Sequence, residues 1–171
     1  SPLKPFLMMS LAKPNLIFDE LLKRDILLHH PYERFEGYVN FIRAAAMDPA
    51  VRSIQQTVYR MDALSPVIEE LKSAAKTKKR VRVIIELRAR FDEMNNLRLA
   101  EDLRKSGVEV AFGFGQLKVH AKVALVTRQE KDGERLYTHL STGNYNAATA
   151  RAYEDLAILT SRPLFGEDAR L

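Results

Sequence analysis

The segment LKVHAKVALV, residues 117–126, places three basic side chains at alternate positions of an otherwise apolar run. Alternate residues of a β-strand face opposite sides, so we expect Lys118, His120 and Lys122 on one side of a strand over 117–127. Unpaired lysines are rarely buried, so such a row suits a strand end that faces an anion. The alternative is a solvated strand whose basic residues share no ligand.

The chemistry that this row could perform follows from its charges. Nearby positive charge lowers the pKa of an imidazole, so the spacing predicts that His120 is neutral and nucleophilic. Lys122 would then bind the oxygens of a phosphoryl group that the imidazole attacks. A pKa of His120 above that of a free histidine, in the absence of ligand, would contradict this hypothesis.

A second group of polar residues is STGNYN, residues 141–146, which follows another expected strand. A turn of this composition allows backbone N–H groups and the side chains of Thr142 and Asn144 to converge on an oxyanion. The alternative is an ordinary turn with no ligand. Its position after the histidine–lysine segment favours the functional interpretation.

Patterns elsewhere predict the elements that must position these groups. Apolar residues at helical spacing over 35–46, ended by Asp48-Pro49, predict a helix, and Ser65-Pro66 is typical of a helix start. Further expected elements are strands at 53–59, 81–87 and 108–112 and helices at 66–76 and from Asp92 to Gly107. This alternation indicates a parallel sheet with right-handed crossovers.

The remaining segments change this organisation. Residues 117–127 and 135–140 predict a hairpin, and residues 155–160 predict a last strand. The expected fold class is therefore α/β, with a mixed, mostly parallel central sheet flanked by helices. The three prolines within residues 1–24 predict an N-terminal arm or linker there rather than a core element.

Composition sets the limits for these predictions. The chain has 171 residues, 46% of them hydrophobic, which is typical of one globular domain, and its formal charge of +5 favours polyanionic partners. It contains no cysteine, which excludes disulfides and cysteine nucleophiles and is compatible with a reducing cytoplasm. No apolar run approaches the roughly 18 residues of a membrane span, so we expect a cytoplasmic protein.

Six segments occur together in an order that matches a known family. They are LLHHPYERF (27–35), QTVYR (56–60), ELRARFDEMNN (86–96), LKVHAKVALV (117–126), HLSTGNYN (139–146) and TARAYEDLAILT (149–160). Together they resemble polyphosphate kinase of the histidine-phosphorylating type, from about Asp25 to Thr160. The resemblance covers the first of two phospholipase D-like domains in that enzyme, and it implies that residues 25–171 form a phospholipase D-like catalytic half-domain.

The resemblance also implies roles for individual residues. It makes His120 the histidine that accepts phosphate, and Tyr153 of ARAYED a position that contacts ATP. Arg60 of TVYR and Arg90 of RARFDE match positions that the family associates with Mg²⁺. A guanidinium has no lone pair for a cation, so we expect both arginines to hold phosphate oxygens that in turn bind Mg²⁺.

The activity implied by the resemblance is that of an ATP:polyphosphate phosphotransferase with ATP as substrate and Mg²⁺ as cofactor. The terminal phosphoryl group of ATP would pass reversibly through a phosphohistidine at His120 to a growing inorganic polyphosphate chain. Expected partners are ATP or ADP, polyphosphate and the remaining domains of a homo-oligomeric enzyme, with no nucleic acid. Because the partner histidine of the resembled enzyme lies in another domain, we expect the isolated chain to be weak or inactive, and membrane association of the complete enzyme stays open.

Two other functions stay open at this point. One is a short phospholipase D-like phosphodiesterase or nuclease that pairs two identical chains across a two-fold axis. That superfamily usually has an aspartate a few residues after the lysine, and VALVTRQE, residues 123–130, contains none, which argues against this function. The other is a non-catalytic module that binds polyanions, whose binding would be sensitive to salt and independent of His120.

Three further histidines and one aspartate are interpreted as structural. His29 and His30 are adjacent, so on a strand they cannot both face one site. His139 is expected to pack near the turn at 141–146. Asp92 is interpreted as a helix cap rather than a metal ligand.

Overall fold

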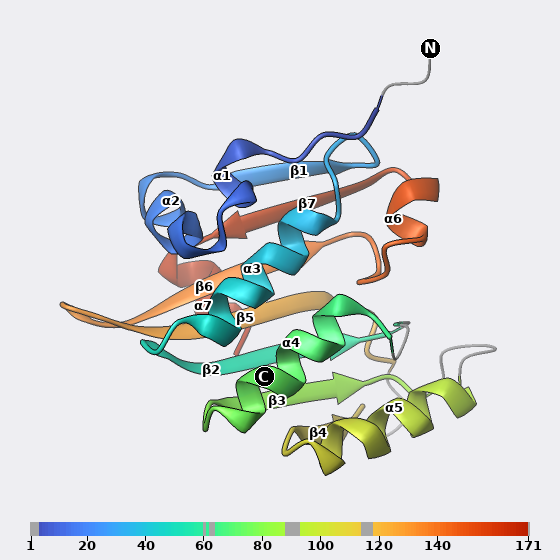
Figure 1. Ribbon diagram of the computed structural model, residues 1–171. Helices are drawn as coiled ribbons and strands as arrows, with labels where there is room; N and C mark the ends of the chain where they lie inside the picture. The colour runs from blue at the N-terminus through green and yellow to red at the C-terminus, as the bar shows by residue number, and fades with distance from the viewer. Residues whose placement is uncertain (1–3, 60, 62–63, 88–92, 114–117, 171) are drawn as a thin grey trace.

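The computed structural model describes residues 4–59, 61, 64–87, 93–113 and 118–170, and it has an α/β fold (Figure 1). Within these ranges seven strands form one sheet in the order β1-β7-β6-β5-β2-β3-β4. The strands are β1 Ile26–His30, β2 Val51–Val58, β3 Arg80–Ile85, β4 Glu109–Phe112, β5 Lys122–Glu130, β6 Gly133–Ser141 and β7 Asp155–Thr160. The helices are α1 Met9–Ala12, the 3-10 helix η1 Pro14–Leu16, α2 Ile17–Lys23, α3 Glu36–Met47, α4 Pro66–Lys76, α5 Glu93–Lys105, α6 Thr149–Ala152 and α7 Pro163–Asp168.

One half of the sheet is parallel, and its helices begin and end where the sequence predicts. Strands β2, β3 and β4 pair in parallel, with α4 and α5 as the crossovers between them. The Ser65 hydroxyl accepts a hydrogen bond from the Val67 amide, and Pro66 occupies the first turn of α4. Gly107 has φ of 87°, a conformation that glycine adopts readily, and it follows the end of α5.

The other half of the sheet is antiparallel, which corrects the expectation of a mostly parallel sheet. The predicted hairpin is confirmed as β5 and β6, while β7 and β1 add to it in antiparallel pairs, as does β2 on the other side of β5. Four of the six strand pairings are therefore antiparallel. One physical reason is that the chain reverses at the hairpin and again after α6, so that each strand pairs antiparallel with the strand before it. The other is that β1, which the sequence did not predict, pairs antiparallel with β7.

The N-terminal helices belong to the core and do not form the separate arm that the prolines predicted. Ile17, Phe18 and Leu21 of α2 are buried within the main hydrophobic cluster. The Phe18 ring lies edge-on to Tyr137 of β6, with ring centroids 4.7 Å apart, and it also contacts Phe41 of α3. The apolar residues of this short helix share one face, and their burial outweighs the local preference of proline for irregular backbone.

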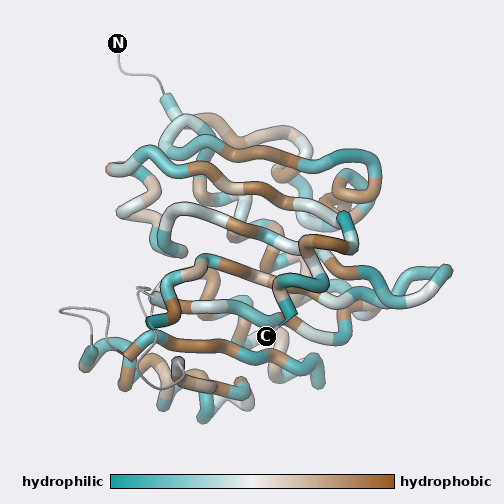
Figure 2. The backbone as a smooth tube through the Cα atoms, turned by 180° about the vertical axis from the view of Figure 1, so that it is seen from behind, coloured by the Kyte–Doolittle hydropathy of each residue, from teal (hydrophilic) through white to brown (hydrophobic). Residues whose placement is uncertain are grey.

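Helices cover the two faces of the sheet unequally. Figure 1 shows α3, α4 and α5 across one face, and α3 contacts α4 along its length. On the opposite face, seen in Figure 2, α7 and the chain end lie against β6, where Ala169 joins a small cluster with Val123 and Leu125. Among the described helices, none has the length and apolar character that crossing a membrane requires.

Candidate active site

The strand directions bring the polar segments identified in the sequence to one edge of the sheet. Strands β2 and β3 end at this edge, and β5 begins there because it runs antiparallel to β2, with Gln56 opposite Ala124 (Figure 1). Strand β6 ends there at Ser141, opposite Lys122, and β7 begins there at Asp155. The segment before β5, the turn after β6 and the start of β7 therefore meet.

His120 lies at this edge in contact with Lys122. The Lys122 ammonium nitrogen is 3.1 Å from Nε2 and 3.2 Å from Nδ1 of the His120 ring, so it faces the ring between the two nitrogens. The Tyr59 ring meets the imidazole edge-on at a centroid distance of 4.8 Å. His120 is exposed, whereas Lys122 is only 7% exposed, so a ligand from solvent can reach the imidazole.

The strand that carries these residues is shorter than the sequence predicts. Strand β5 begins at Lys122, so Lys118 and His120 lie in irregular backbone before it. Strict alternation therefore does not explain why His120 and Lys122 lie together, and Lys118 is simply exposed near the same edge. Residue 117 lies outside the described residues.

The electrostatic environment keeps His120 neutral near pH 7. Partial burial lowers the pKa of the imidazole below its usual 6.5, and the charges of Lys122 and then Lys118 lower it further. The direction is the one that the sequence predicted, although desolvation contributes more than the lysines. Burial also lowers the pKa of the Lys122 ammonium, and the carboxylate of Asp155 opposes part of this change.

Two side chains that the sequence did not single out hold the backbone around His120. The Val119 amide donates to a carboxylate oxygen of Glu86 at 2.6 Å. The Thr57 hydroxyl donates to the Ala121 carbonyl at 2.6 Å, and the Val123 amide donates to the same hydroxyl at 3.0 Å.

The turn at 141–146 is tied to the start of β7. The Thr142 hydroxyl donates to the Asp155 carboxylate at 2.8 Å and accepts from the Leu156 amide at 3.0 Å. A Cβ atom at Gly143 would collide with the Asp155 carboxylate, so glycine allows this close approach. The side-chain amide oxygen of Asn144 is buried, and it has no hydrogen-bond partner among the described residues.

Asp155 is a site residue that sequence reasoning missed. The phospholipase D-like pattern has an aspartate a few residues after the lysine, and residues 123–130 of this chain contain none. The structure instead brings Asp155 to Thr142 from the beginning of β7, and its charge acts on Lys122. Its neighbourhood depends on the antiparallel pairing of β6 with β7, which no local pattern reveals.

Of the remaining predicted site residues, only Tyr153 lies within the described part of the chain. Tyr153 follows α6, and its side chain is 63% exposed. Arg60 and Arg90, the positions expected to act with Mg²⁺, lie outside the described residues, as does Asp92. In the part of the chain that is described, no three His, Asp or Glu side chains gather in a way that would hold a metal ion.

Of the other histidines, His30 and His139 are buried in structural positions, as the sequence predicts, whereas His29 is exposed. His30 is 4% exposed, and its Nδ1 lies 2.7 Å from the Glu33 carbonyl oxygen, whereas His29 points to solvent on the other face of β1. His139 is 2% exposed, with its Nδ1 3.1 Å from the hydroxyl of Tyr145 in the turn.

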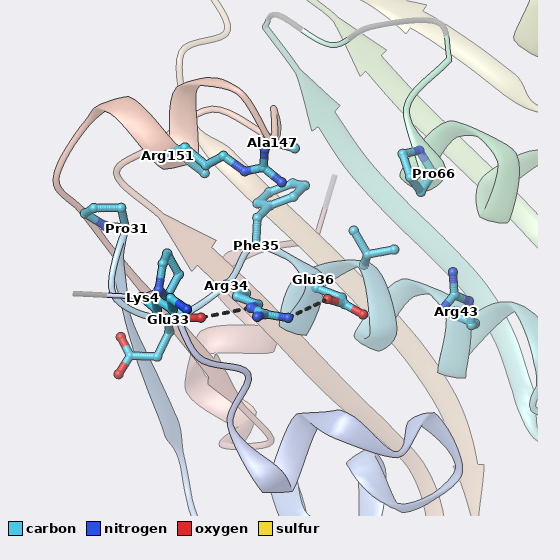
Figure 3. Close-up of a pocket in the computed structure, with 13 residues that line it drawn as sticks. Lys4, Pro31, Glu33, Arg34, Phe35, Glu36, Arg43, Pro66, Ala147 and Arg151 are labelled. Atoms are coloured by element: carbon cyan, nitrogen blue, oxygen red, sulfur yellow. Dashed lines mark hydrogen bonds and ion pairs between the residues drawn. The ribbon is translucent and has the colours of Figure 1, made fainter. Parts of the chain in front are cut away.

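A cavity of about 780 Å³ lies on the same edge, between the start of α3 and α6 (Figure 3). Four of its lining residues are basic, and two of these have partners: Arg34 donates to the Pro5 carbonyl, and Arg43 pairs with Glu70 at 2.7 Å. Figure 3 shows Arg151 of α6 and Phe35 among the side chains that line this cavity. His120 and Lys122 are not among its lining residues, so the cavity is separate from the contact described above.

Comparison with known proteins decides the family. Residues 16–171 match the model of polyphosphate kinase C-terminal domain 1. The chain belongs to this family. The curated polyphosphate kinase of Halalkalibacterium halodurans is 51% identical over 153 residues, which is 90% of this chain and 22% of that protein. The polyphosphate kinase of Bacillus cereus is 48% identical over 153 residues, with the same coverage, so this polyphosphate kinase domain spans about a fifth of the relatives that it matches.

Solved structures agree on the fold. The crystal structure of polyphosphate kinase from Porphyromonas gingivalis superposes with a TM-score of 0.83 and 38% identity, over 96% of this chain and 28% of that one. NucT from Helicobacter pylori superposes with a TM-score of 0.63 over 85% of this chain and 90% of that one, at 15% identity, which shows a shared fold alone. The predicted phospholipase D-like α/β fold is thereby confirmed.

Proposed function

We propose that this chain is a phosphoryl-transfer domain of a polyphosphate kinase, and that His120 carries the phosphoryl group as a phosphohistidine. The observation that carries the proposal is the exposed His120 imidazole, with the Lys122 ammonium 3.1 Å from one ring nitrogen, at an edge where burial and positive charge lower the pKa of the histidine. A neutral imidazole has the free lone pair that attack on phosphorus requires. The chain belongs to a polyphosphate kinase domain family, and phosphoryl transfer by a polyphosphate kinase can proceed through such an attack.

The proposed transfer has two steps. In the first, a ring nitrogen of His120 forms a bond to the γ-phosphorus of ATP while the bond from that phosphorus to the bridging oxygen breaks, and ADP leaves. In the second, a terminal oxygen of polyphosphate attacks the same phosphorus and the P–N bond breaks, which returns the neutral imidazole. Both steps are reversible because a phosphoramidate is reactive toward either acceptor.

Other residues of the edge would bind the phosphate oxygens. Lys122 is already next to the ring, so its ammonium can offset the charge on the transferring group. Lys118, and Asn144 through its side-chain NH2 group, would also bind phosphate oxygens, and exposed Tyr153 can contact the nucleotide. The Thr142 hydroxyl donates its proton to Asp155, and the Thr142 and Gly143 amides donate to the Leu156 carbonyl and the Ser141 hydroxyl, so these groups shape the turn.

Mg²⁺ would enter this site bound to phosphate oxygens of the substrates. The described residues offer no cluster of metal ligands, and guanidinium groups such as those of Arg60 and Arg90 have no lone pair for a cation. Both arginines would therefore bind phosphate oxygens that carry Mg²⁺, and Mg²⁺ would supply further charge neutralisation there.

The proposed activity belongs to a larger assembly. The chain spans about a fifth of its relatives, so we propose that ATP, ADP and polyphosphate bind between this domain and the remaining domains of a homo-oligomeric cytoplasmic enzyme. A single histidine–lysine segment is half of a phospholipase D-like site, so the chain alone should be weak or inactive. The fold likeness to NucT, at 15% identity, adds no support for a nuclease.

The test uses the complete enzyme that contains this domain. After incubation with ATP labelled at the γ-phosphate, we expect a label that is lost in acid, stable in base and mapped to His120 by mass spectrometry. His29→Ala is the matched control, because His29 is also an exposed histidine but lies away from Lys122 on β1. A label that survives acid, or that persists in His120→Ala, would reject the phosphohistidine.

A further inference from the structure

The backbone on both sides of His120 is fixed by side chains rather than by strand pairing. Residues 118–121 have no regular secondary structure, because β5 begins only at Lys122. Irregular backbone at an exposed edge is ordinarily mobile. Here the residue before His120 donates its amide to Glu86, and the residue after it accepts from Thr57, each at 2.6 Å.

Glu86 is itself held firmly, so it can act as a fixed anchor. It follows β3 directly and is 3% exposed, and its amide donates to the Val58 carbonyl at 2.9 Å. Its carbonyl accepts at 2.8 Å from the side-chain amide of Asn96, which is 1% exposed and donates also to the Tyr59 carbonyl at 3.1 Å. A hydrogen bond from a backbone amide to a carboxylate is short and strong when it is sheltered from water, and the 2.6 Å bond to Val119 is of this kind.

Thr57 replaces the strand pairing that ends beside it. The pairing between β2 and β5 is complete as far as Gln56 and Ala124. The next residue of β2, Thr57, is 2% exposed and uses one hydroxyl to donate to the Ala121 carbonyl and to accept from the Val123 amide. A single side chain thus sets the backbone on both sides of Lys122.

We propose that Glu86 and Thr57 are positioning residues that hold the His120 imidazole against Lys122 for phosphoryl transfer. The proposal rests on the proposed role of His120. The two anchors come from neighbouring parallel strands, so their separation is fixed by the sheet, and the segment between them has little freedom. Loss of either anchor should let the ring move away from the ammonium without removing any group that touches the substrate.

The threonine gives the sharper experiment. In the complete enzyme, Thr57→Val keeps the shape but removes the hydroxyl, whereas Thr57→Ser keeps the hydroxyl. A misplacement of about 1 Å lowers a reaction rate by as much as ~100-fold, so we expect Thr57→Val to form phosphohistidine roughly 10–100-fold more slowly, with the KM for ATP within about twofold. Thr57→Ser should restore the rate to within about threefold of the wild type, since its hydroxyl can donate and accept in the same way.

Thr138→Val is the matched control. Thr138 is fully buried in β6, and its hydroxyl has no hydrogen-bond partner among the described residues. The same substitution there removes a hydroxyl from the core of the same sheet but should leave the rate of phosphohistidine formation unchanged. Equal melting temperatures for the two valine variants would separate a positioning effect from a loss of folding.

Glu86 is tested by a second pair of variants. Glu86→Gln keeps an oxygen that can accept from the Val119 amide, and Glu86→Leu removes it. We expect the glutamine variant to react faster than the leucine variant, and the pKa of His120 to move up toward 6.5 in the leucine variant as the ring leaves Lys122.

The outcomes are distinct. The positioning role is overturned if folded Thr57→Val labels His120 at the wild-type rate, or if Thr57→Ser is as slow as Thr57→Val. Should Glu86→Leu fail to fold, the threonine pair decides alone. A wild-type enzyme that acquires no label on His120 would instead reject the proposed function, which the variants do not address.

Discussion

His120 and His139 are both neutral near pH 7, yet they are neutral for different reasons. His139 is fully enclosed, 4.3 Å from the Tyr38 ring centroid and hydrogen-bonded to Tyr145, and burial lowers its pKa to about 3, with a smaller contribution from His30. His120 stands exposed at the sheet edge, where partial burial and two lysines lower its pKa.

The difference separates a structural histidine from a candidate nucleophile. The neutral ring of His139 supports the turn at 141–146, because it is hydrogen-bonded to the Tyr145 hydroxyl and the Tyr145 ring stacks on Tyr38 at a centroid distance of 4.5 Å. No ligand can reach it without unfolding the core. His120 combines the lone pair of a neutral ring with access from solvent, which is the combination that phosphoryl transfer needs.

The largest expected effect of any substitution is on His120 itself. Removing the nucleophile from an active site whose residues act together lowers the reaction rate by roughly 10⁴-fold or more. We therefore expect His120→Ala to abolish polyphosphate synthesis by the complete enzyme. His139→Phe should keep measurable synthesis, because the enclosed His139 ring cannot touch the substrate. Single-turnover assays at equal concentrations of folded protein measure both, and a His139→Phe enzyme as inactive as His120→Ala would break the contrast.

Acid should unfold the protein through His139. Its folded pKa of about 3 lies below the usual 6.5, so between these values the unfolded state binds the extra proton, and stability is lost as pH falls from 6.5 toward 3. The difference corresponds to at most about 5 kcal/mol. Denaturant unfolding of the wild-type chain and His139→Phe across this range should show a steeper acid loss in the wild type, and equal slopes would contradict the assignment.

Lys122 should contribute less than the nucleophile His120 but more than exposed Lys118. Its ammonium is 3.1 Å from the His120 ring and 7% exposed, where charge interactions are only weakly screened. Lys122→Gln should lower the rate of phosphoryl transfer by roughly 10²–10³-fold and raise the pKa of His120. An unchanged pH–rate profile would show that the lysine acts on the substrate alone.

The smallest effect is expected at Lys118. It is the least of the three influences that lower the pKa of His120, and it is exposed. Solvent and salt screen exposed charges, so Lys118→Gln should change the rate by no more than about threefold and should raise the pKa of His120 only slightly. An effect as large as that of Lys122→Gln would show that Lys118 contributes as much as the lysine in contact with the His120 ring, against this prediction.

Local patterns predicted the elements of this fold better than their arrangement. The start of α4 at Ser65-Pro66 and the hairpin of β5 and β6 were readable because capping residues and β-rich runs act over a few positions. Strand β1, with two histidines in five residues, gave no such signal. Its pairing with β7, which makes that half of the sheet antiparallel, depends on contacts far apart in the sequence.

The candidate site, like the fold, was predicted only where its residues lie close together along the chain. His120 and Lys122 were found because their spacing is local, and the turn with Asn144 was found for the same reason. Thr57 and Glu86 were missed because their contacts with the backbone near His120 arise only when β2 pairs with β5 and β3 pairs with the other side of β2. Those contacts also explain why β5 starts at Lys122 and not earlier.

The most direct measurement is an NMR titration of carbon-13-labelled histidines in the unliganded enzyme, with the His120 signal assigned by its loss in His120→Ala. The account predicts a pKa for His120 below 6.5 that rises in Lys122→Gln, while His139 stays neutral until far lower pH. A pKa for His120 above 6.5 in the wild-type enzyme would contradict a neutral nucleophile held against Lys122.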